Sequence, residues 1–182
     1  MPIMKTIAHH FASAAFLTLA ILCAAGQVAR SQEPLDGPKR IFKDELLENL
    51  VGEWKLSRQI RGRTVENTVQ VDWVLNHQFL RIHMKDVQTP ASYEAMVFVG
   101  YDNTSDRYVA HWIDVFGGRF SETLGYGQRS GNSISFVFEY PDGPFHNTFT
   151  WNPADKTWTF LAEQKNKEGK WTTFAEDKLR RP

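Results

Sequence analysis

The chain has 182 residues, and its 21 Lys and Arg residues balance its 21 Asp and Glu residues. This balance argues against a nucleic-acid partner and against electrostatic attachment to anionic lipid, because both need a basic surface. With 42% hydrophobic and 13% aromatic residues, the composition is that of a globular protein with one sizeable core.

The first residues have the pattern of an export signal. Lys5 precedes the apolar run 14–25, and small residues follow it, as in a secretory signal peptide. The apolar run is too short for a bilayer span, which needs roughly 20 residues. We expect residues 1–26 to be the signal peptide and residues 27–42 to be a polar linker. The mature protein is then exported to the bacterial periplasm or the exterior, with no stable membrane insertion.

Cys23 is the only cysteine of the chain, and it lies inside the expected signal peptide. The mature protein therefore has no disulfide and no thiol chemistry, so its fold must rest on its hydrophobic core. A mature chain of about 150 residues can do so, because it buries roughly two-thirds of the surface that the unfolded chain exposes.

A short amphipathic helix is expected next, over residues 41–52. Its apolar side chains fall on one helical face, and Gly52 is a suitable stop signal. The residues on this face are Phe42, Leu46, Leu47, Leu50 and Val51.

From Gly52 onward the hydrophobic period changes to two, which is typical of half-buried strands. In VQVDWVL, for example, Val69, Val71 and Trp73 share one face. Turn residues recur about every ten residues, and no second helical pattern occurs between them. The clearest further alternations cover residues 79–84, 133–140, 145–151 and 157–162.

This pattern predicts an all-β domain over residues 43–182 with roughly ten strands joined by short connections. Parallel strands would need long crossovers, which the sequence lacks. We expect an antiparallel up-and-down β-barrel of about 8–10 strands, preceded by one short helix, because closure removes exposed strand edges. A two-sheet β-sandwich is the alternative.

Three motifs together resemble a known family. They are LVGEW at 50–54, LNHQFLR at 75–81 and GYDNTSDRYVAHWID at 100–114. The first is similar to the Gly-x-Trp opening of lipocalin-like (calycin) barrels, and the set resembles a family of uncharacterised bacterial lipocalin-like domains. The resemblance implies the barrel fold but no established activity. It also implies that Trp54 packs at the closed end of the barrel against a basic residue near the C-terminus. The candidates for that residue are Lys178, Arg180 and Arg181.

The strand RYVAHWIDV has two faces, one of which must line the interior of a barrel. The first face carries Tyr108, Ala110, Trp112 and Asp114. The second face carries Val109, His111, Ile113 and Val115. Each face sets one titratable group among largely apolar side chains, as ligand pockets do, so alternation leaves both faces open. The plain structural reading of the same residues is packing for Trp112 and a loop contact for Asp114.

The segment FSETLGY, residues 120–126, predicts a further strand with Glu122 and Tyr126 on one face. A hairpin turning at Gly117-Gly118 would bring Asp114 and Glu122 together. Two neighbouring carboxylates of this kind form an acid–base pair, because one of them is held protonated. The alternative is that this strand faces outward.

The sequence predicts no metal site and no cofactor. The histidines of the expected mature chain, His77, His83, His111 and His146, lack the spacing of metal ligands. A lone histidine such as His111 could still bind haem inside a barrel, as in some calycin-type haem proteins. Nucleophile-elbow, phosphate-loop and dinucleotide motifs are absent from the sequence.

The leading hypothesis is an exported lipocalin-like barrel that binds a small apolar or amphipathic molecule in its interior. One alternative is an isomerase, cyclase or hydrolase that uses an Asp/Glu pair or His111. The other is a non-catalytic interaction protein of the cell envelope. The candidate ligand-binding residues are Tyr101, His111, Trp112, Asp114, Glu122 and Tyr126.

Overall fold

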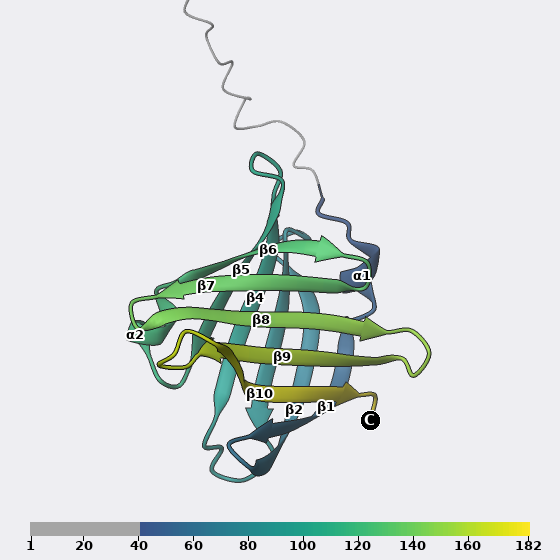
Figure 1. Ribbon diagram of the computed structural model, residues 1–182. Helices are drawn as coiled ribbons and strands as arrows, with labels where there is room; N and C mark the ends of the chain where they lie inside the picture. The colour runs from purple at the N-terminus through teal and green to yellow at the C-terminus, as the bar shows by residue number, and fades with distance from the viewer. Residues whose placement is uncertain (1–40) are drawn as a thin grey trace, which may run out of the picture. The chain divides into compact units, whose positions relative to one another are not determined.

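A computed structural model describes residues 41–182 (Figure 1). The expected signal peptide, residues 1–26, and the expected linker up to residue 40 lie outside the described residues. Within residues 41–182, no helix has the length and apolar character that crossing a membrane requires.

Ten antiparallel strands form a closed barrel in the described part of the chain. Each strand is hydrogen-bonded to the next one in the sequence, and β1 pairs with β10, so the sheet has no free edge. This arrangement confirms the all-β up-and-down barrel and rules out the two-sheet sandwich. The strands are β1 (Gly52–Ile60), β2 (Arg63–Val74), β3 (Phe79–Asp86), β4 (Glu94–Asp102), β5 (Arg107–Asp114), β6 (Leu124–Ser130), β7 (Ser133–Tyr140), β8 (Gly143–Asn152), β9 (Thr157–Lys165) and β10 (Trp171–Arg180).

The helix that precedes the barrel, α1 (Glu45–Glu48), is a single turn, much shorter than the expected 41–52. It begins where Asp44 caps it: the Asp44 carboxylate accepts from the backbone N–H groups of Leu46 and Leu47, both at 2.9 Å. It ends at Asn49, whose side chain donates back to the Glu45 carbonyl at 2.8 Å. The apolar face is present, but a good cap at each end limits the helix to one turn.

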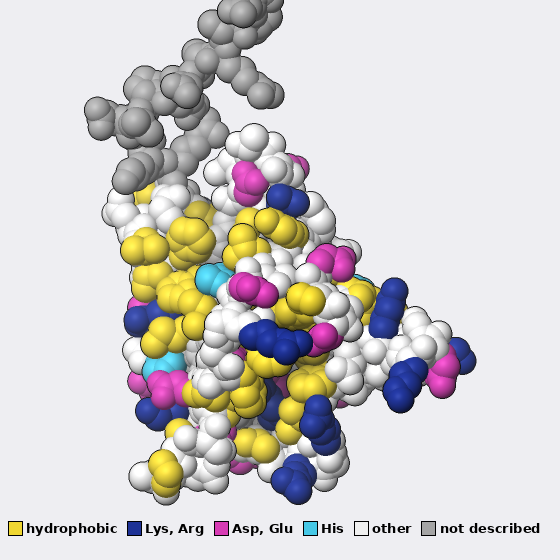
Figure 2. Space-filling view, turned by 90° about the vertical axis from the view of Figure 1, so that its left-hand side faces the viewer, with side chains coloured by type: hydrophobic (Ala, Val, Ile, Leu, Met, Phe, Trp, Pro, Cys, Tyr) yellow, Lys and Arg dark blue, Asp and Glu magenta, His cyan; other side chains and the backbone are white. Residues whose placement is uncertain are grey.

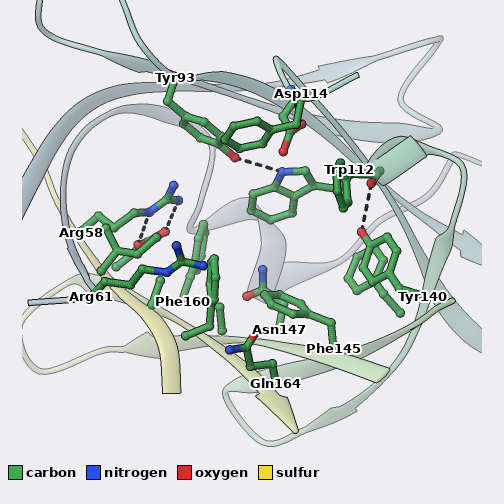
Figure 3. Close-up of a pocket in the computed structure, with 18 of the residues that line it drawn as sticks. Arg58, Arg61, Tyr93, Trp112, Asp114, Tyr140, Phe145, Asn147, Phe160 and Gln164 are labelled. Atoms are coloured by element: carbon green, nitrogen blue, oxygen red, sulfur yellow. Dashed lines mark hydrogen bonds and ion pairs between the residues drawn. The ribbon is translucent and has the colours of Figure 1, made fainter. Parts of the chain in front are cut away.

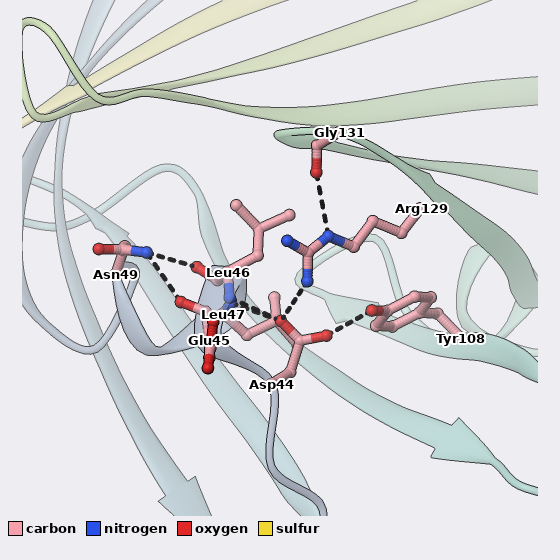
Figure 4. A network of polar contacts seen from close by, with 8 residues as sticks. All are labelled: Asp44, Glu45, Leu46, Leu47, Asn49, Tyr108, Arg129 and Gly131. Atoms are coloured by element: carbon pink, nitrogen blue, oxygen red, sulfur yellow. Dashed lines mark hydrogen bonds and ion pairs between the residues drawn. The ribbon is translucent and has the colours of Figure 1, made fainter.

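Asp44 also ties α1 to the barrel wall (Figure 4). The Tyr108 hydroxyl on β5 donates to the Asp44 carboxylate, and an Arg129 amino group on β6 lies 3.6 Å from it. Burial and the bond to Asp44 raise the pKa of Tyr108 above its ordinary value, so the hydroxyl stays protonated and keeps donating. One buried carboxylate therefore both starts the helix and fixes it to two strands.

Trp54 lies at the α1 end of the barrel, where its indole N–H donates to the Leu50 carbonyl at 2.6 Å. The Arg181 guanidinium carbon lies 3.7 Å from the centre of the Trp54 ring, and the Arg181 Nη2 group donates to the Val51 carbonyl at 2.9 Å. This is the contact that the resemblance implied, with Arg181 as the basic partner. Gly52 permits it, because a Cβ at that position would lie 2.5 Å from Arg181 Nη1.

A second helical turn, α2 (Gly118–Ser121), corrects the expectation of one helix and of a strand beginning at Phe120. It follows Gly117, whose φ of +84° suits glycine, and β6 begins only at Leu124. A single turn of four residues is too short for a 3.6-residue period to register in the sequence. Figure 1 places α1 and α2 at opposite ends of the barrel.

The interior divides into a packed half and a hollow half along the barrel axis. Near α1, large side chains from both walls fill the space at 2% exposure or less, including Leu56, Val69, Met84, Phe136 and Phe149. The other half surrounds a cavity.

Candidate functional site

The cavity has a volume of about 1120 Å³ and is lined by side chains from around the barrel (Figure 3). A barrel of about eight strands has an interior that side chains can fill, and the diameter grows with strand number. Ten strands therefore leave more room than the side chains of this sequence occupy. Because successive strands run in opposite directions, the connections β1–β2, β3–β4, β5–β6, β7–β8 and β9–β10 all lie at the end away from α1. We call this end the mouth.

Aromatic side chains form one part of the cavity wall. Phe138 and Tyr140 on β7 stack with ring centres 5.9 Å apart, and Tyr140 meets Phe145 on β8 edge to face at 6.4 Å. Trp112 on β5 and Phe160 on β9 extend the surface on either side. Flat apolar walls of this kind are what a ring-bearing or otherwise apolar ligand contacts.

A buried ion pair, Arg58–Asp177, lies at the floor of the cavity. The Arg58 Nε and Nη2 atoms donate to the two Asp177 oxygens at 2.7 and 2.6 Å, and the two side chains are 12% and 5% exposed. Burial alone would lower the pKa of Arg58, but the bond to Asp177 and its charge raise it above the ordinary value. The guanidinium is therefore permanently charged and already neutralised, so it does not offer a free site to an anion.

Asp86 on β3 is a second buried carboxylate of the floor. It accepts from the Asn67 side chain at 2.7 Å and from the backbone N–H groups of Ser92 and Tyr93 at 3.1 and 2.9 Å. Burial would raise its pKa, but these bonds and those from the Ser92 and Gln88 side chains lower it below the ordinary value. Asp86 stays ionised, and it holds the β3–β4 connection in place.

Asp114 at the end of β5 is in a different electrostatic setting. Within the described residues, its carboxylate accepts a hydrogen bond only from the Phe116 backbone N–H, at 3.0 Å, and forms no salt bridge. Burial raises the pKa of the Asp114 carboxyl. Its neighbours in the cavity are the hydroxyl groups of Tyr93 and Tyr140, whose pKa values burial also raises.

Two asparagines of the floor have a carboxamide oxygen without a hydrogen-bond partner. Asn67 on β2 is 2% exposed and Asn147 on β8 is 4% exposed, and both line the cavity. The Oδ1 atom of each is buried and receives no hydrogen bond in the described part of the chain. Buried acceptors are nearly always paired in folded proteins, so these two are notable.

The rim of the mouth mixes basic and apolar side chains. Phe116 and Phe120, beside and within α2, are 66% and 46% exposed, and Arg119 between them pairs with Asp142 at 3.2 Å. Further basic groups come from the β1–β2 and β9 ends of the wall. Figure 2, which faces the α2 side, shows hydrophobic side chains lying between Lys and Arg side chains. The additional basic rim residues are Arg61, Arg63 and Lys165.

The structure separates the six candidate residues into three locations. Trp112 and Asp114 line the cavity, so the inward face of β5 is the one that also carries Tyr108 and Ala110. Tyr101 packs at the opposite end of the barrel, with its ring 5.0 Å from that of Tyr108.

The other three candidates lie on the outside of the barrel. The His111 Nε2–H donates to the Ser121 carbonyl at 2.6 Å, and Glu122 is exposed at the end of α2. Tyr126 is 40% exposed, with the Arg107 guanidinium carbon 3.7 Å from its ring centre. His111 also borders a small outer groove of about 400 Å³ among apolar residues of β3–β6.

Two chemical expectations are thereby corrected. The hairpin that would have joined Asp114 to Glu122 is replaced by α2, so the first carboxylate faces the cavity while the second faces solvent. The carboxylate pair is not formed. A haem inside the barrel could not use His111, because that side chain points outward to Ser121. Among residues 41–182, no group of three or more His, Cys, Asp or Glu side chains is arranged to hold a metal ion.

Sequence reasoning missed Arg58, Asp177 and Asn147 as cavity residues, although a signal for them exists. Each occupies an inward position of an otherwise apolar alternation: Arg58 follows Trp54 and Leu56, and Asp177 stands between Ala175 and Leu179. A polar residue in phase with a buried face marks either a buried pair or a binding site.

Residues 42–181 match the model of a protein family described as "Protein of unknown function (DUF1579)". The chain belongs to the DUF1579 family. No curated protein matches the chain. The DUF1579 match runs from Phe42, before α1, to Arg181, after β10, so it covers the entire barrel with its helical end and its Trp54–Arg181 contact. The description of DUF1579 assigns no activity, so function must be argued from the cavity.

Proposed function

We propose that this DUF1579 barrel is an exported, lipocalin-like protein that binds a small amphipathic molecule in its cavity. The observation that carries the proposal is the hollow half of the barrel, about 1120 Å³ in volume and lined by aromatic side chains with a few polar groups among them. Binding sites for small molecules have this composition and a comparable size.

The aromatic wall would supply most of the affinity. Removing about 300 Å² of apolar ligand surface from water contributes roughly 7.5 kcal/mol. Part of this is offset by the lost freedom of the ligand, so micromolar affinity is the expected range. The polar groups of the floor, together with Asp114 and the tyrosines, would orient the ligand.

Two features support the lipocalin-like part of the proposal. The strands follow one another around the barrel without crossovers, and Arg181 covers Trp54 at the closed end. Lipocalin barrels have eight strands, whereas this barrel has ten, which accounts for a wider interior. The export part rests on the N-terminal sequence pattern. Catalysis by Asp114 and Glu122 is not part of the proposal, because Glu122 lies outside the cavity.

Titration of the purified protein with the neutral dye N-phenyl-1-naphthylamine tests the proposal. We expect saturable fluorescence enhancement that is lost in Ala162→Trp, because Ala162 lines the cavity on β9 and an indole there fills part of it. Leu161→Trp is the matched control, since neighbouring positions of a strand point to opposite faces. Dye binding that is the same in Ala162→Trp and the wild type would refute interior binding. Mass spectrometry of solvent extracts from the protein would identify a bound molecule.

A further inference from the structure

The mouth of the cavity carries basic side chains that have no acidic partner. Arg61 is in the turn between β1 and β2, Arg63 begins β2, and Lys165 ends β9. All three line the cavity, and none of them forms a salt bridge within residues 41–182. They differ in this respect from Arg58 at the floor, whose charge Asp177 neutralises.

Two hairpins that are neighbours in the barrel bring these cations to one side of the mouth. Because β1 pairs with β10, the β1–β2 turn lies on the same side as the β9–β10 connection, where Lys165 is opposite Trp171. Arg63 continues the inward alternation of β2 that also carries Val65 and Asn67, and all three line the cavity. The mouth therefore has one basic side.

Arg61 connects this basic side with the aromatic wall. Its guanidinium carbon lies 5.5 Å from the centre of the Phe174 ring, and Phe174 meets Phe145 edge to face at 5.5 Å. In Figure 3 the Arg61 side chain extends from the rim toward the middle of the cavity. A molecule whose acidic head meets Arg61 can therefore place its apolar part along the aromatic rings.

The acidic side chains at the mouth do not cancel these positive charges. Asp142 is paired with Arg119 at 3.2 Å, and Glu168 accepts a hydrogen bond from a neighbouring side chain at 2.8 Å. Asp114 and Glu122 belong to the β5–β6 side, which lies opposite β1 and β10 in the ring of strands. An anionic group at the β1–β2 turn therefore meets cations first, with Asp114 across the cavity from it.

We propose that the ligand of this cavity is an amphipathic anion whose acidic head is bound at the mouth by Arg61 and Arg63, with Lys165 on the same side. This inference rests on the proposed function and adds the chemical class of the ligand. An arginine guanidinium presents paired N–H donors that match the oxygens of a carboxylate or a phosphate. The apolar part of the ligand would extend inward along the aromatic wall, where its burial contributes most of the affinity.

The test compares two dyes that differ by one sulfonate group, anionic 8-anilino-1-naphthalenesulfonate and neutral N-phenyl-1-naphthylamine, by fluorescence titration of the purified protein. We expect Arg61→Gln/Arg63→Gln to bind the anionic dye about ten-fold more weakly, because charge-assisted hydrogen bonds are lost. Its affinity for the neutral dye should stay within about two-fold of the wild type. Lys156→Gln/Arg180→Gln is the matched control: it removes the same charge from exposed positions at the closed end and should leave both affinities unchanged.

An equal loss of affinity for both dyes in Arg61→Gln/Arg63→Gln would overturn the inference, because the arginines would then shape the cavity rather than bind a charge. An unchanged affinity for the anionic dye would overturn it as well, and both results leave interior binding intact. Binding of the anionic dye that survives Ala162→Trp would place that dye outside the cavity and also overturn the inference. If the wild type binds neither dye, the proposed function fails too.

The wild type alone supplies a second test, should the double arginine variant fail to fold. Raising the salt concentration from about 0.02 to about 0.5 M should weaken binding of the anionic dye but not of the neutral one, because salt screens exposed charges. Equal responses of the two dyes to salt would overturn the inference.

Discussion

Arg58 and Asp177 are directly opposite each other in the register of β1 and β10, the first and last strands. Their side chains are 119 positions apart in the sequence and form a bidentate pair where the two ends of the sheet meet. Opposite charges at one register position specify how these strands align, because a slip of one residue would turn one of the two side chains to solvent and leave the other charge buried without its partner. The pair thus contributes to the specificity of closure.

Replacing Asp177 by Asn should lower the free energy of unfolding by about 3–5 kcal/mol, because the Arg58 charge remains buried without its partner. The double variant Arg58→Met/Asp177→Leu should recover most of that loss, since no charge is then buried. Urea unfolding of the two variants and the wild type measures both effects. An Asp177→Asn variant that is as stable as the wild type would show that the ion pair does not contribute to the free energy of unfolding.

The lowered pKa of Asp86 predicts that part of the free energy of unfolding is lost at acidic pH. Its pKa is lowered in the folded protein from an ordinary value of 3.8, so the unfolded chain takes up the proton first as the pH falls. The stabilisation is complete above pH 3.8 and is lost as the pH falls through the lowered pKa of the folded state. The urea midpoint of the wild type should therefore drop more between pH 6 and about pH 3 than that of Asp86→Asn. Parallel pH profiles for both proteins would contradict this assignment.

At the scale of elements, the two helical turns lie at opposite ends of the barrel and are held in different ways. α1 is fixed by buried side chains and by Asp44, and it seals the packed half. α2 lies where the pairing of β5 with β6 stops, after the pair His111–Leu124, and its residues line the cavity rim. The closed end is therefore built by packing and the mouth by a short exposed segment.

At the closed end, Gly52 leaves no room for a side chain. Gly52→Ala combines a φ of +113° with a Cβ that would lie 2.5 Å from Arg181, so it should destabilise the protein by roughly 1–3 kcal/mol. Gly131→Ala is the control, because its φ is +57° but nothing lies within 4 Å of the added carbon. We expect the smaller loss there in thermal or urea unfolding. Equal losses would mean that backbone strain alone matters.

At the scale of the whole molecule, the sequence was sufficient to predict the barrel because alternation and turn residues are local signals. The strand of Val69, Val71 and Trp73 could be assigned from its own residues. The sequence could not predict which face of β5 lines the cavity, because each face sets one titratable group among apolar ones. The inward face is decided by how the distant strands close the barrel. The unpaired Oδ1 atom of Asn147 could not be predicted either, because it depends on which side chains the neighbouring strands place around it.

The pairing of β1 with β10 also constrains how the protein folds during its synthesis. A ribosome delivers the first strand long before the last one, and until residues 171–180 emerge the growing sheet keeps two unprotected borders. Most of its pairings can form between sequence neighbours, but the final one joins segments that are far apart along the chain and is slow for that reason. A nascent chain in which this last pairing has not yet formed would be prone to aggregate through its unpaired strand edges. Prompt completion of the polypeptide therefore increases the yield of folded barrel.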